Sequence, residues 1–121
     1  REIVFIMRLS EDKITVLMPV YNSERTVNAS IKSVLNQSYR NFDFIIVNDG
    51  STDGTDSIIR SLKDDRIKYF VCEHKGRSAA SNFAISKAET EYVARIDSDD
   101  LFFNDKLENS CIFRKAINQT V

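Results

Sequence analysis

The sequence is poor in the residues that mark several large classes of protein. It has three glycines, one proline, two cysteines and no tryptophan among its 121 residues. So little glycine and proline excludes collagen-like and low-complexity chains, and 42% apolar residues exclude a disordered chain and suffice for one ordinary core. We therefore predict a single domain over residues 1–121, in which 1–12 form an N-terminal extension of uncertain role.

An excess of charge of one sign is also lacking, as is a long apolar run. Seventeen Lys and Arg residues balance eighteen Asp and Glu residues, so no global field favours a nucleic-acid partner. The longest apolar runs, such as 3–7 and 44–47, are far shorter than the roughly 20 residues of a transmembrane segment. Cys72 and Cys111 lack metal-ligand spacing, and we expect reduced thiols and a cytoplasmic location.

Compact apolar runs alternate with helical patterns along the chain. The runs are Ile14–Val20, 42–47, 67–72 and 92–96, and the helical patterns between them are 23–37, with Asn22 or Ser23 as N-cap, 56–63 and 78–87. Continuous rather than alternating apolar strands are typical of a sheet that is covered on both faces. The prediction is an α/β fold, an open and mostly parallel Rossmann-like sheet with helices on both faces.

A further helical pattern covers residues 105–118, and the chain stops almost immediately after it. We therefore expect the domain to be truncated.

Ligands of such sheets bind beyond the carboxyl ends of the strands, where the loops diverge. Pro19, Val20 and Tyr21 lie where the first strand ends, and the ring of Tyr21 could stack on a planar base or simply pack on its own helix. Asp49 follows the second strand. Its carboxylate only accepts hydrogen bonds, which suits the ring N–H of uracil, thymine or guanine. The alternative is a turn in which Asp53 or Thr55 caps the next helix.

The third and fourth strands are followed by charged residues. Lys75, Arg77 and a helix N-terminus could bind a pyrophosphate or form a solvated basic turn, and we interpret His74 as a surface or loop-packing residue rather than a ligand. Asp97 and Asp99 lie two residues apart on an extended segment, so they share one side. Two such carboxylates suit Mg²⁺ or Mn²⁺, whereas the alternative is an acidic helix N-terminus.

These segments together closely resemble glycosyltransferase family 2 over residues 13–107. The resemblance is carried by ITVLMPVYN at 14–22, SVLNQSY at 33–39, IIVNDGSTDGT at 45–55, SAASN at 78–82 and ARIDSDD at 94–100. It implies the A-type glycosyltransferase fold and its nucleotide-sugar-binding half. The family usually has two aspartates before the glycine of this motif, and Asn48 replaces the first of them. Ser81 stands where the family often has a basic residue, and Arg77 would substitute for that basic residue.

The resemblance also implies roles for individual residues. Pro19, Val20 and Tyr21 would border the base, Asp49 would hydrogen-bond it, and Arg77 would contact the phosphates. Asp97, Ser98 and Asp99 would form the DXD motif of the family, in which Asp97 contacts the ribose or the metal and Asp99 binds the metal; Asp100 is a further candidate ligand. The ion, Mn²⁺ or Mg²⁺, would stabilise the leaving diphosphate.

The implied activity is the transfer of a sugar from a nucleoside-diphosphate sugar, with UDP favoured, in polysaccharide biosynthesis. The acceptor would be a glycan or a lipid-linked glycan at the inner face of the membrane. We expect no catalytic residue within this chain, because the base that activates the acceptor would lie beyond Val121. The chain alone should transfer sugar poorly, and an incomplete domain could self-associate through exposed apolar surface.

Other classes of function remain as alternatives or are excluded. A non-catalytic nucleotide-binding module would keep the same binding residues and show neither transfer nor donor hydrolysis. A phosphoacceptor receiver domain is disfavoured because it needs acidic residues directly after the first strand. Dinucleotide oxidoreduction is disfavoured because neither GxGxxG nor GxxxxGK[ST] occurs in the sequence.

Overall fold

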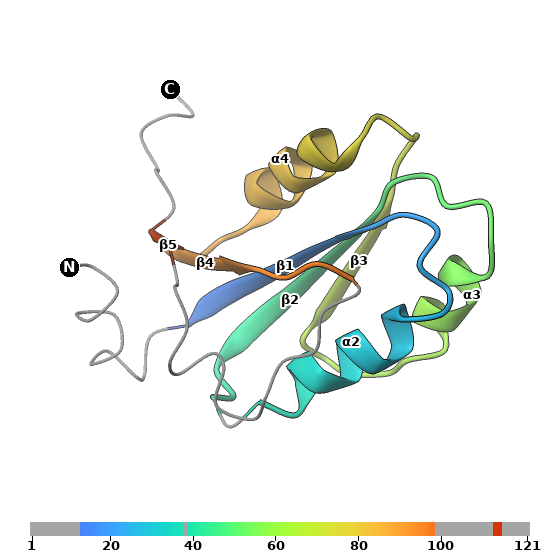
Figure 1. Cartoon of the computed structure of the whole chain (residues 1–121). Coiled ribbons are helices and arrows are strands. Elements are labelled where there is room, and N and C mark those ends of the chain that lie inside the picture. Colours follow the sequence, from blue (N-terminus) through green and yellow to red (C-terminus); the bar gives the residue numbers. More distant parts are fainter. Residues whose placement is uncertain (1–12, 38, 99–112, 115–121) are drawn as a thin grey trace.

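A computed structural model describes residues 13–37, 39–98 and 113–114 of the chain. Within these residues the sheet has the strand order β3-β2-β1-β4-β5 (Figure 1). The first four strands are parallel: β1 (Ile14–Val20), β2 (Phe42–Asn48), β3 (Ile67–Val71) and β4 (Tyr92–Arg95). The short β5 (Phe113–Arg114) runs antiparallel to β4. The predicted α/β class and mostly parallel sheet are thus confirmed.

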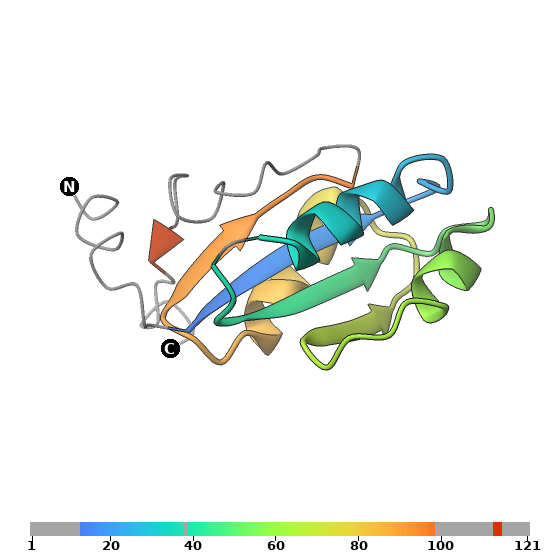
Figure 2. The same ribbon diagram turned by 90° about the horizontal axis from the view of Figure 1, so that it is seen from below.

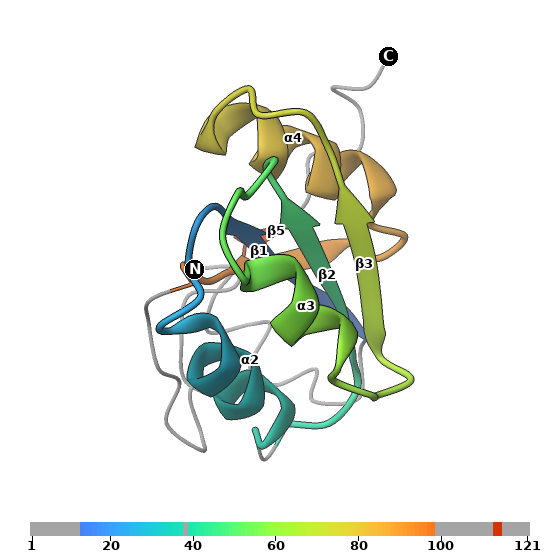
Figure 3. The ribbon, with the colours of Figure 1, turned by 90° about the vertical axis from the view of Figure 1, so that its right-hand side faces the viewer.

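Helices cover both faces of the sheet, as predicted. The helices are α2 (Val27–Leu35), α3 (Thr55–Arg60) and α4 (Arg77–Lys87). Figure 3 shows α4 on one side of the strands and α2 and α3 on the other. Each helix connects two parallel strands, so its N-terminus and the carboxyl end of the preceding strand lie at the same edge of the sheet.

The core has two parts because side chains alternate between the two faces of each strand. On β1, Val16 and Met18 pack in a cluster with residues of α2 and α3, whereas Leu17 packs in a second cluster with Ala80 and Ala84 of α4. All seven residues of both β1 and β2 are buried, which explains why these strands are mostly apolar on both faces. Figure 2 shows these two strands in the middle of the sheet, between the helical layers.

The helix predicted over 105–118 is wrong at residues 113–114, which form strand β5. The free edge of β4 offers unpaired backbone groups to this segment, and ladder hydrogen bonds outweigh a short helical pattern. The other residues of that prediction lie outside the described part of the chain.

The second correction concerns the beginning of α2. The helix begins at Val27, not at residue 23, and Thr26, its N-cap, makes no capping hydrogen bond through its side chain. Asn22 and Ser23 therefore do not cap the helix. Instead the Ser23 amide donates to the Thr55 hydroxyl at 2.8 Å, so this segment is held by the first residue of α3.

Among the described residues, no helix combines the length and the apolar character that a membrane crossing requires.

Candidate functional site

A cavity of about 530 Å³ lies beyond the carboxyl ends of the parallel strands. It is bordered by the loops that follow β1, β2, β3 and β4. Six of the residues that the sequence singled out line it: Pro19, Val20, Tyr21, Asp49, Arg77 and Ser98. The fold thus brings together side chains from four separate loops at the edge where ligands of open α/β sheets bind. A cavity of this size can hold a drug-sized ligand.

The loops after β1 and β2 are joined by hydrogen bonds that fix one wall of the cavity. Asn22 has a φ of 46°, and its side-chain oxygen accepts a hydrogen bond of 2.7 Å from the amide of Thr52. The Glu24 carboxylate accepts one of 2.8 Å from the amide of Gly54. Asparagine tolerates the left-handed region better than most residues. These contacts position Tyr21 at the cavity without any ligand.

Asp49 lies almost fully buried between the loops after β2 and β3. Its residue is 3% exposed, and its carboxylate accepts hydrogen bonds from the amides of Lys75 at 2.8 Å and Gly76 at 3.0 Å. The Nδ1 atom of His74 approaches the same carboxylate at 2.9 Å. Asp49 therefore holds the segment that leads into α4, in addition to lining the cavity.

His74 is a residue of this site that sequence reasoning missed. Its ring stacks on that of Tyr21, with 4.1 Å between the ring centroids and 19° between the planes. The His74 side chain is 54% exposed and lines the cavity. The only sequence signal is a single histidine between a strand and a glycine, because both of its partners lie on other loops.

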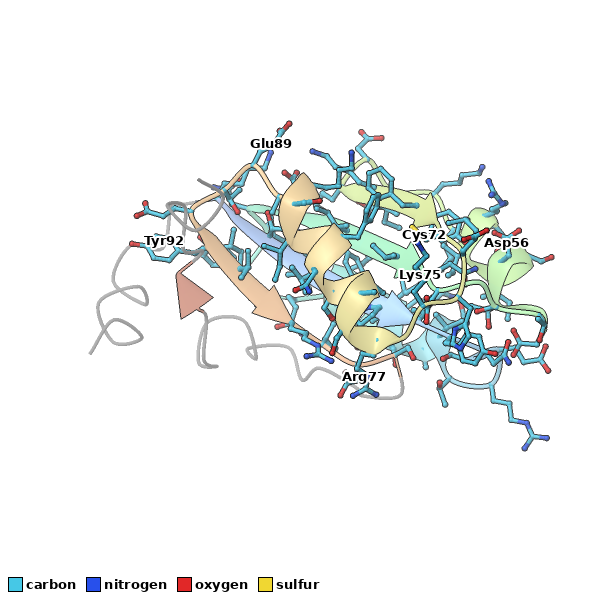
Figure 4. All side chains as sticks on the ribbon, turned by 90° about the horizontal axis from the view of Figure 1, so that it is seen from above. Asp56, Cys72, Lys75, Arg77, Glu89 and Tyr92 are labelled. Atoms are coloured by element: carbon cyan, nitrogen blue, oxygen red, sulfur yellow. The ribbon has the colours of Figure 1, made fainter. Side chains whose placement is uncertain are left out.

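Asp97, unlike the other predicted binding residues, does not line the cavity, but it lies close to Arg77, which does. Arg77 is the first residue of α4, and Figure 4 shows it at the beginning of that helix, with Lys75 on the preceding loop. The Arg77 Nη1 atom lies 3.7 Å from Asp97 Oδ1, and the Arg95 Nη2 atom lies 3.6 Å from the same oxygen. These ion pairs are longer than good hydrogen bonds, so the Asp97 carboxylate keeps acceptor capacity for a ligand.

Ser98 is held by two short contacts, one with the loop before α2 and one with α2 itself. Its hydroxyl lies 2.7 Å from that of Ser23, and its carbonyl accepts a hydrogen bond of 2.7 Å from the hydroxyl of Ser30 on α2. Ser30 itself is completely buried. The segment that carries Asp97 is therefore anchored at Ser98.

The predicted metal site is only partly described. Asp99 and Asp100 lie outside the described residues, and among those described no group of three His, Cys, Asp or Glu side chains could hold a metal. Asp97 is the member of the predicted set that the structure places, and its side chain is 36% exposed. An open carboxylate beside the cavity is the oxygen donor that a hard divalent ion prefers, so this residue fits the role.

The two departures from the family pattern have different surroundings. The Asn48 side chain donates to the Tyr69 hydroxyl at 2.9 Å, which a carboxylate could not do, and it accepts from the amide of Ser51 at 2.9 Å. The Tyr69 hydroxyl in turn donates to Asp56 at 2.6 Å. Burial and this hydrogen bond raise the pKa of Tyr69 to about 12. The hydroxyl of Ser81 is buried without a hydrogen-bond partner among the described residues.

Comparison with known proteins decides the family. The family model described as "Glycosyl transferase family 2" matches residues 15–110. The chain belongs to glycosyl transferase family 2. It spans between 16 and 41% of the length of the first curated relatives that it matches. One relative in Escherichia coli, the UDP-Glc:alpha-D-GlcNAc-diphosphoundecaprenol beta-1,3-glucosyltransferase WfgD, is 40% identical over 78% of this chain and 38% of its own length.

Solved structures of glycosyltransferases share the fold. Staphylococcus aureus TarS 1–349 in complex with UDP is 30% identical, with a TM-score of 0.74 over 80% of this chain and 30% of the TarS chain. The mannosyltransferase PcManGT from Pyrobaculum calidifontis, in complex with GDP-Man and Mn²⁺, is 28% identical, with a TM-score of 0.75 over 81% of this chain and 31% of its own. The A-type glycosyltransferase fold predicted from the sequence is thereby confirmed.

Proposed function

We propose that this chain binds the donor in a glycosyltransferase that transfers a sugar from a nucleoside-diphosphate sugar, with UDP favoured. The observation that carries the proposal is the cavity at the strand ends, where Tyr21 and Asp49 from two loops meet Arg77 from the beginning of α4. An aromatic ring, a hydrogen-bond acceptor and a cation match the base and the phosphates of a nucleotide. The complexes of TarS with UDP and of PcManGT with GDP-Man support this assignment.

Within the cavity the base is assigned to the side of Pro19, Val20, Tyr21 and Asp49. The diphosphate is assigned to the opposite side, near Arg77 and the N-terminus of α4. Arg77 is 64% exposed, and its one ion pair among the described residues is a long one of 3.7 Å, so its guanidinium can turn to a phosphate at little cost. The eleven-residue α4 directs backbone N–H groups toward the same place, and its dipole favours an anion there. Ser98 lines this half of the cavity, and Asp97 precedes it in the chain and lies 3.7 Å from Arg77.

The metal of the proposed reaction is Mn²⁺ or Mg²⁺, held by Asp97 and Asp99, with Asp100 as a further candidate. When bound, such an ion neutralises the negative charge of the leaving diphosphate. The guanidinium groups of Arg77 and Arg95 orient the carboxylate of Asp97. The contacts of Ser98 with Ser23 and Ser30 hold the backbone next to Asp97. The Mn²⁺ in the PcManGT complex supports a divalent ion in this family.

The acceptor and the base that activates it are assigned to parts of the parent protein outside this chain. The chain matches less than half the length of its curated relatives, which leaves room for an acceptor-binding part. A glycan or lipid-linked glycan is the proposed acceptor, and the name of WfgD, which includes a diphosphoundecaprenol acceptor, supports this class. The isolated chain should therefore bind donor and transfer it poorly.

Thermal unfolding of the chain with UDP, with and without Mn²⁺, tests the proposal. A ligand at one hundred times its Kd adds about 2.7 kcal/mol to the free energy of unfolding, so the Tm should rise by several degrees. In Asp97→Asn the additional rise caused by Mn²⁺ should shrink, because a neutral amide is a weaker ligand for a hard cation.

Asp65→Asn is the matched control, because it removes the same charge at an exposed position between α3 and β3. This variant should respond to UDP and Mn²⁺ as the original chain does. The proposal fails if no concentration of UDP raises the Tm of the original chain. The metal assignment fails if Asp97→Asn keeps the full effect of Mn²⁺.

A further inference from the structure

Strand β3 forms an uncovered edge of the sheet. It is the outermost strand of the order β3-β2-β1-β4-β5, and Figures 2 and 3 show no helix or strand beyond it in the described part of the chain. Val71 on this strand is 51% exposed. The other large apolar side chain that is exposed among the described residues, Tyr21, lines the cavity. The β3 edge therefore combines an apolar side chain with an open strand.

The hydrogen bonds between β2 and β3 show which backbone groups point away from the sheet. The amide of Cys72 donates to the carbonyl of Asn48 at 2.9 Å, so the backbone of Cys72 faces β2. Alternate residues of a strand direct their N–H and C=O groups to the same side, so the residues two and four positions before Cys72 face β2 as well. The N–H and C=O groups of Tyr69 and Val71 therefore point outward, with no backbone partner among the described residues.

The charged side chains beside β3 have partners within their own chain. A free lysine on an edge strand commonly prevents pairing with another strand. Here the ammonium of Lys68 lies 3.4 Å from the carboxylate of Asp43 on β2, and the ammonium of Lys87 lies over two aromatic rings. On the other face of the sheet Arg60 pairs with Asp56 at 3.0 Å. These charges are thus already compensated when a second strand approaches.

We propose that the β3 edge binds β3 of a second copy of this chain, with the two strands antiparallel and Phe70 at the two-fold axis. Phe70 then lies opposite Phe70 of the second copy, and Tyr69 lies opposite Val71 of the second copy. The outward N–H and C=O groups of these opposite residues exchange hydrogen bonds. Aromatic pairs and pairs of an aromatic with a β-branched residue stabilise antiparallel strands. The strand is therefore complementary to itself, which makes a second copy its partner.

Charges at the two ends of the strand favour this register. Asp65 precedes β3 and Lys75 follows it; both are exposed, and neither has an ion pair among the described residues. Each lies five positions from Phe70, so the proposed register brings Asp65 of one copy toward Lys75 of the other. Pairing centred on Tyr69 would instead bring Asp65 toward Glu73, and like charges opposite each other are unfavourable.

Sedimentation equilibrium of the chain from micromolar to millimolar concentration tests the inference. A pair of five-residue strands is smaller than a stable interface of roughly 1,200–2,000 Å², so the dimer should be weak. The original chain should move from the mass of a monomer toward twice that mass as its concentration rises. Val71→Lys should raise the dissociation constant of the dimer at least roughly tenfold, because it places an unpaired charge at the edge. Val71→Thr, which keeps a β-branched and neutral side chain, is the matched control and should dimerise.

Exchange of the two end charges tests the register. Asp65→Lys and Lys75→Asp should each weaken the dimer, because each brings like charges together. The double variant restores opposite charges and should dimerise as the original chain does, and circular dichroism shows that each variant is folded. An original chain that stays monomeric at millimolar concentration would overturn the inference, as would a Val71→Lys variant that dimerises as tightly as the original chain. A double variant weaker than both single variants would overturn the register.

Discussion

Asp49→Asn should destabilise the chain even when no nucleotide is present. The carboxylate accepts three hydrogen bonds, and two of the donors are backbone amides of the segment that leads into α4. An asparagine at this place has one oxygen, so at least one buried donor would face an NH₂ group instead of an acceptor. Because the residue is 3% exposed, water cannot replace the missing acceptor.

The size of the effect follows from these contacts. A hydrogen bond to a charged group contributes about 1.5–3 kcal/mol, and an unsatisfied buried donor costs a similar amount. We expect a loss of about 2–3 kcal/mol, which for a domain of this size lowers the Tm by roughly 6–15 °C. Circular dichroism during heating measures this directly, with Asp65→Asn as a control that should stay within about a degree or two.

Nucleotide binding separates this account from a purely ligand-binding role of Asp49. At a temperature where Asp49→Asn is folded, UDP should bind weakly, since the loop that carries His74 is no longer fixed. If the variant loses UDP binding but unfolds at the same temperature as the original chain, Asp49 contacts only the ligand. That result would refute the role of its carboxylate in holding residues 74–76.

Two further predictions concern Tyr69 and Gly50. Because the pKa of Tyr69 is raised from 10.0 to about 12, its contribution to stability is complete below pH 10 and is lost as the pH rises through about 12. The Tm of the original chain should therefore fall more steeply over this range than that of Tyr69→Phe, and equal slopes would contradict the contact between Tyr69 and Asp56. Gly50→Ala should lower the Tm by several degrees, because a left-handed backbone costs about 1–2 kcal/mol in alanine and the new Cβ would lie 2.8 Å from a backbone nitrogen. Gly54→Ala is the control for that change, since its Cβ meets only the movable carboxylate of Glu24; equal losses in the two variants would refute the close approach at Gly50.

The strands could be predicted from the sequence because burial on both faces leaves a clear signal. Every residue of β1 is buried, and the observed strand, Ile14–Val20, coincides with the apolar run. Helix boundaries depended on contacts between distant segments. Residues 22–24 are held by the loop before α3 and by the first residue of α3, so α2 begins four residues later than its periodicity indicates. The pairing of residues 113–114 with β4 had no local signal at all.

Much of the candidate site could also be predicted, because strand order places the loop residues at one edge of the sheet. Tyr21, Asp49 and Arg77 line the same cavity, as their positions after successive strands indicated. His74 was interpreted as loop packing because its hydrogen bond to Asp49 and its stacking on Tyr21 exist only in three dimensions. The positions of Asp99 and Asp100 stay predictions.

Amide NMR of the chain during titration with UDP in the presence of Mg²⁺ tests the central claim most directly. If the cavity binds the donor, the largest shift changes should fall on residues 20–23, 49, 74–77 and 97–98, which come from four loops around one cavity. The amides of Leu35, Asp64 and Arg66, at the opposite end of the sheet, should change little. Shift changes centred on that opposite end, or no changes at millimolar UDP, would contradict the proposed donor site.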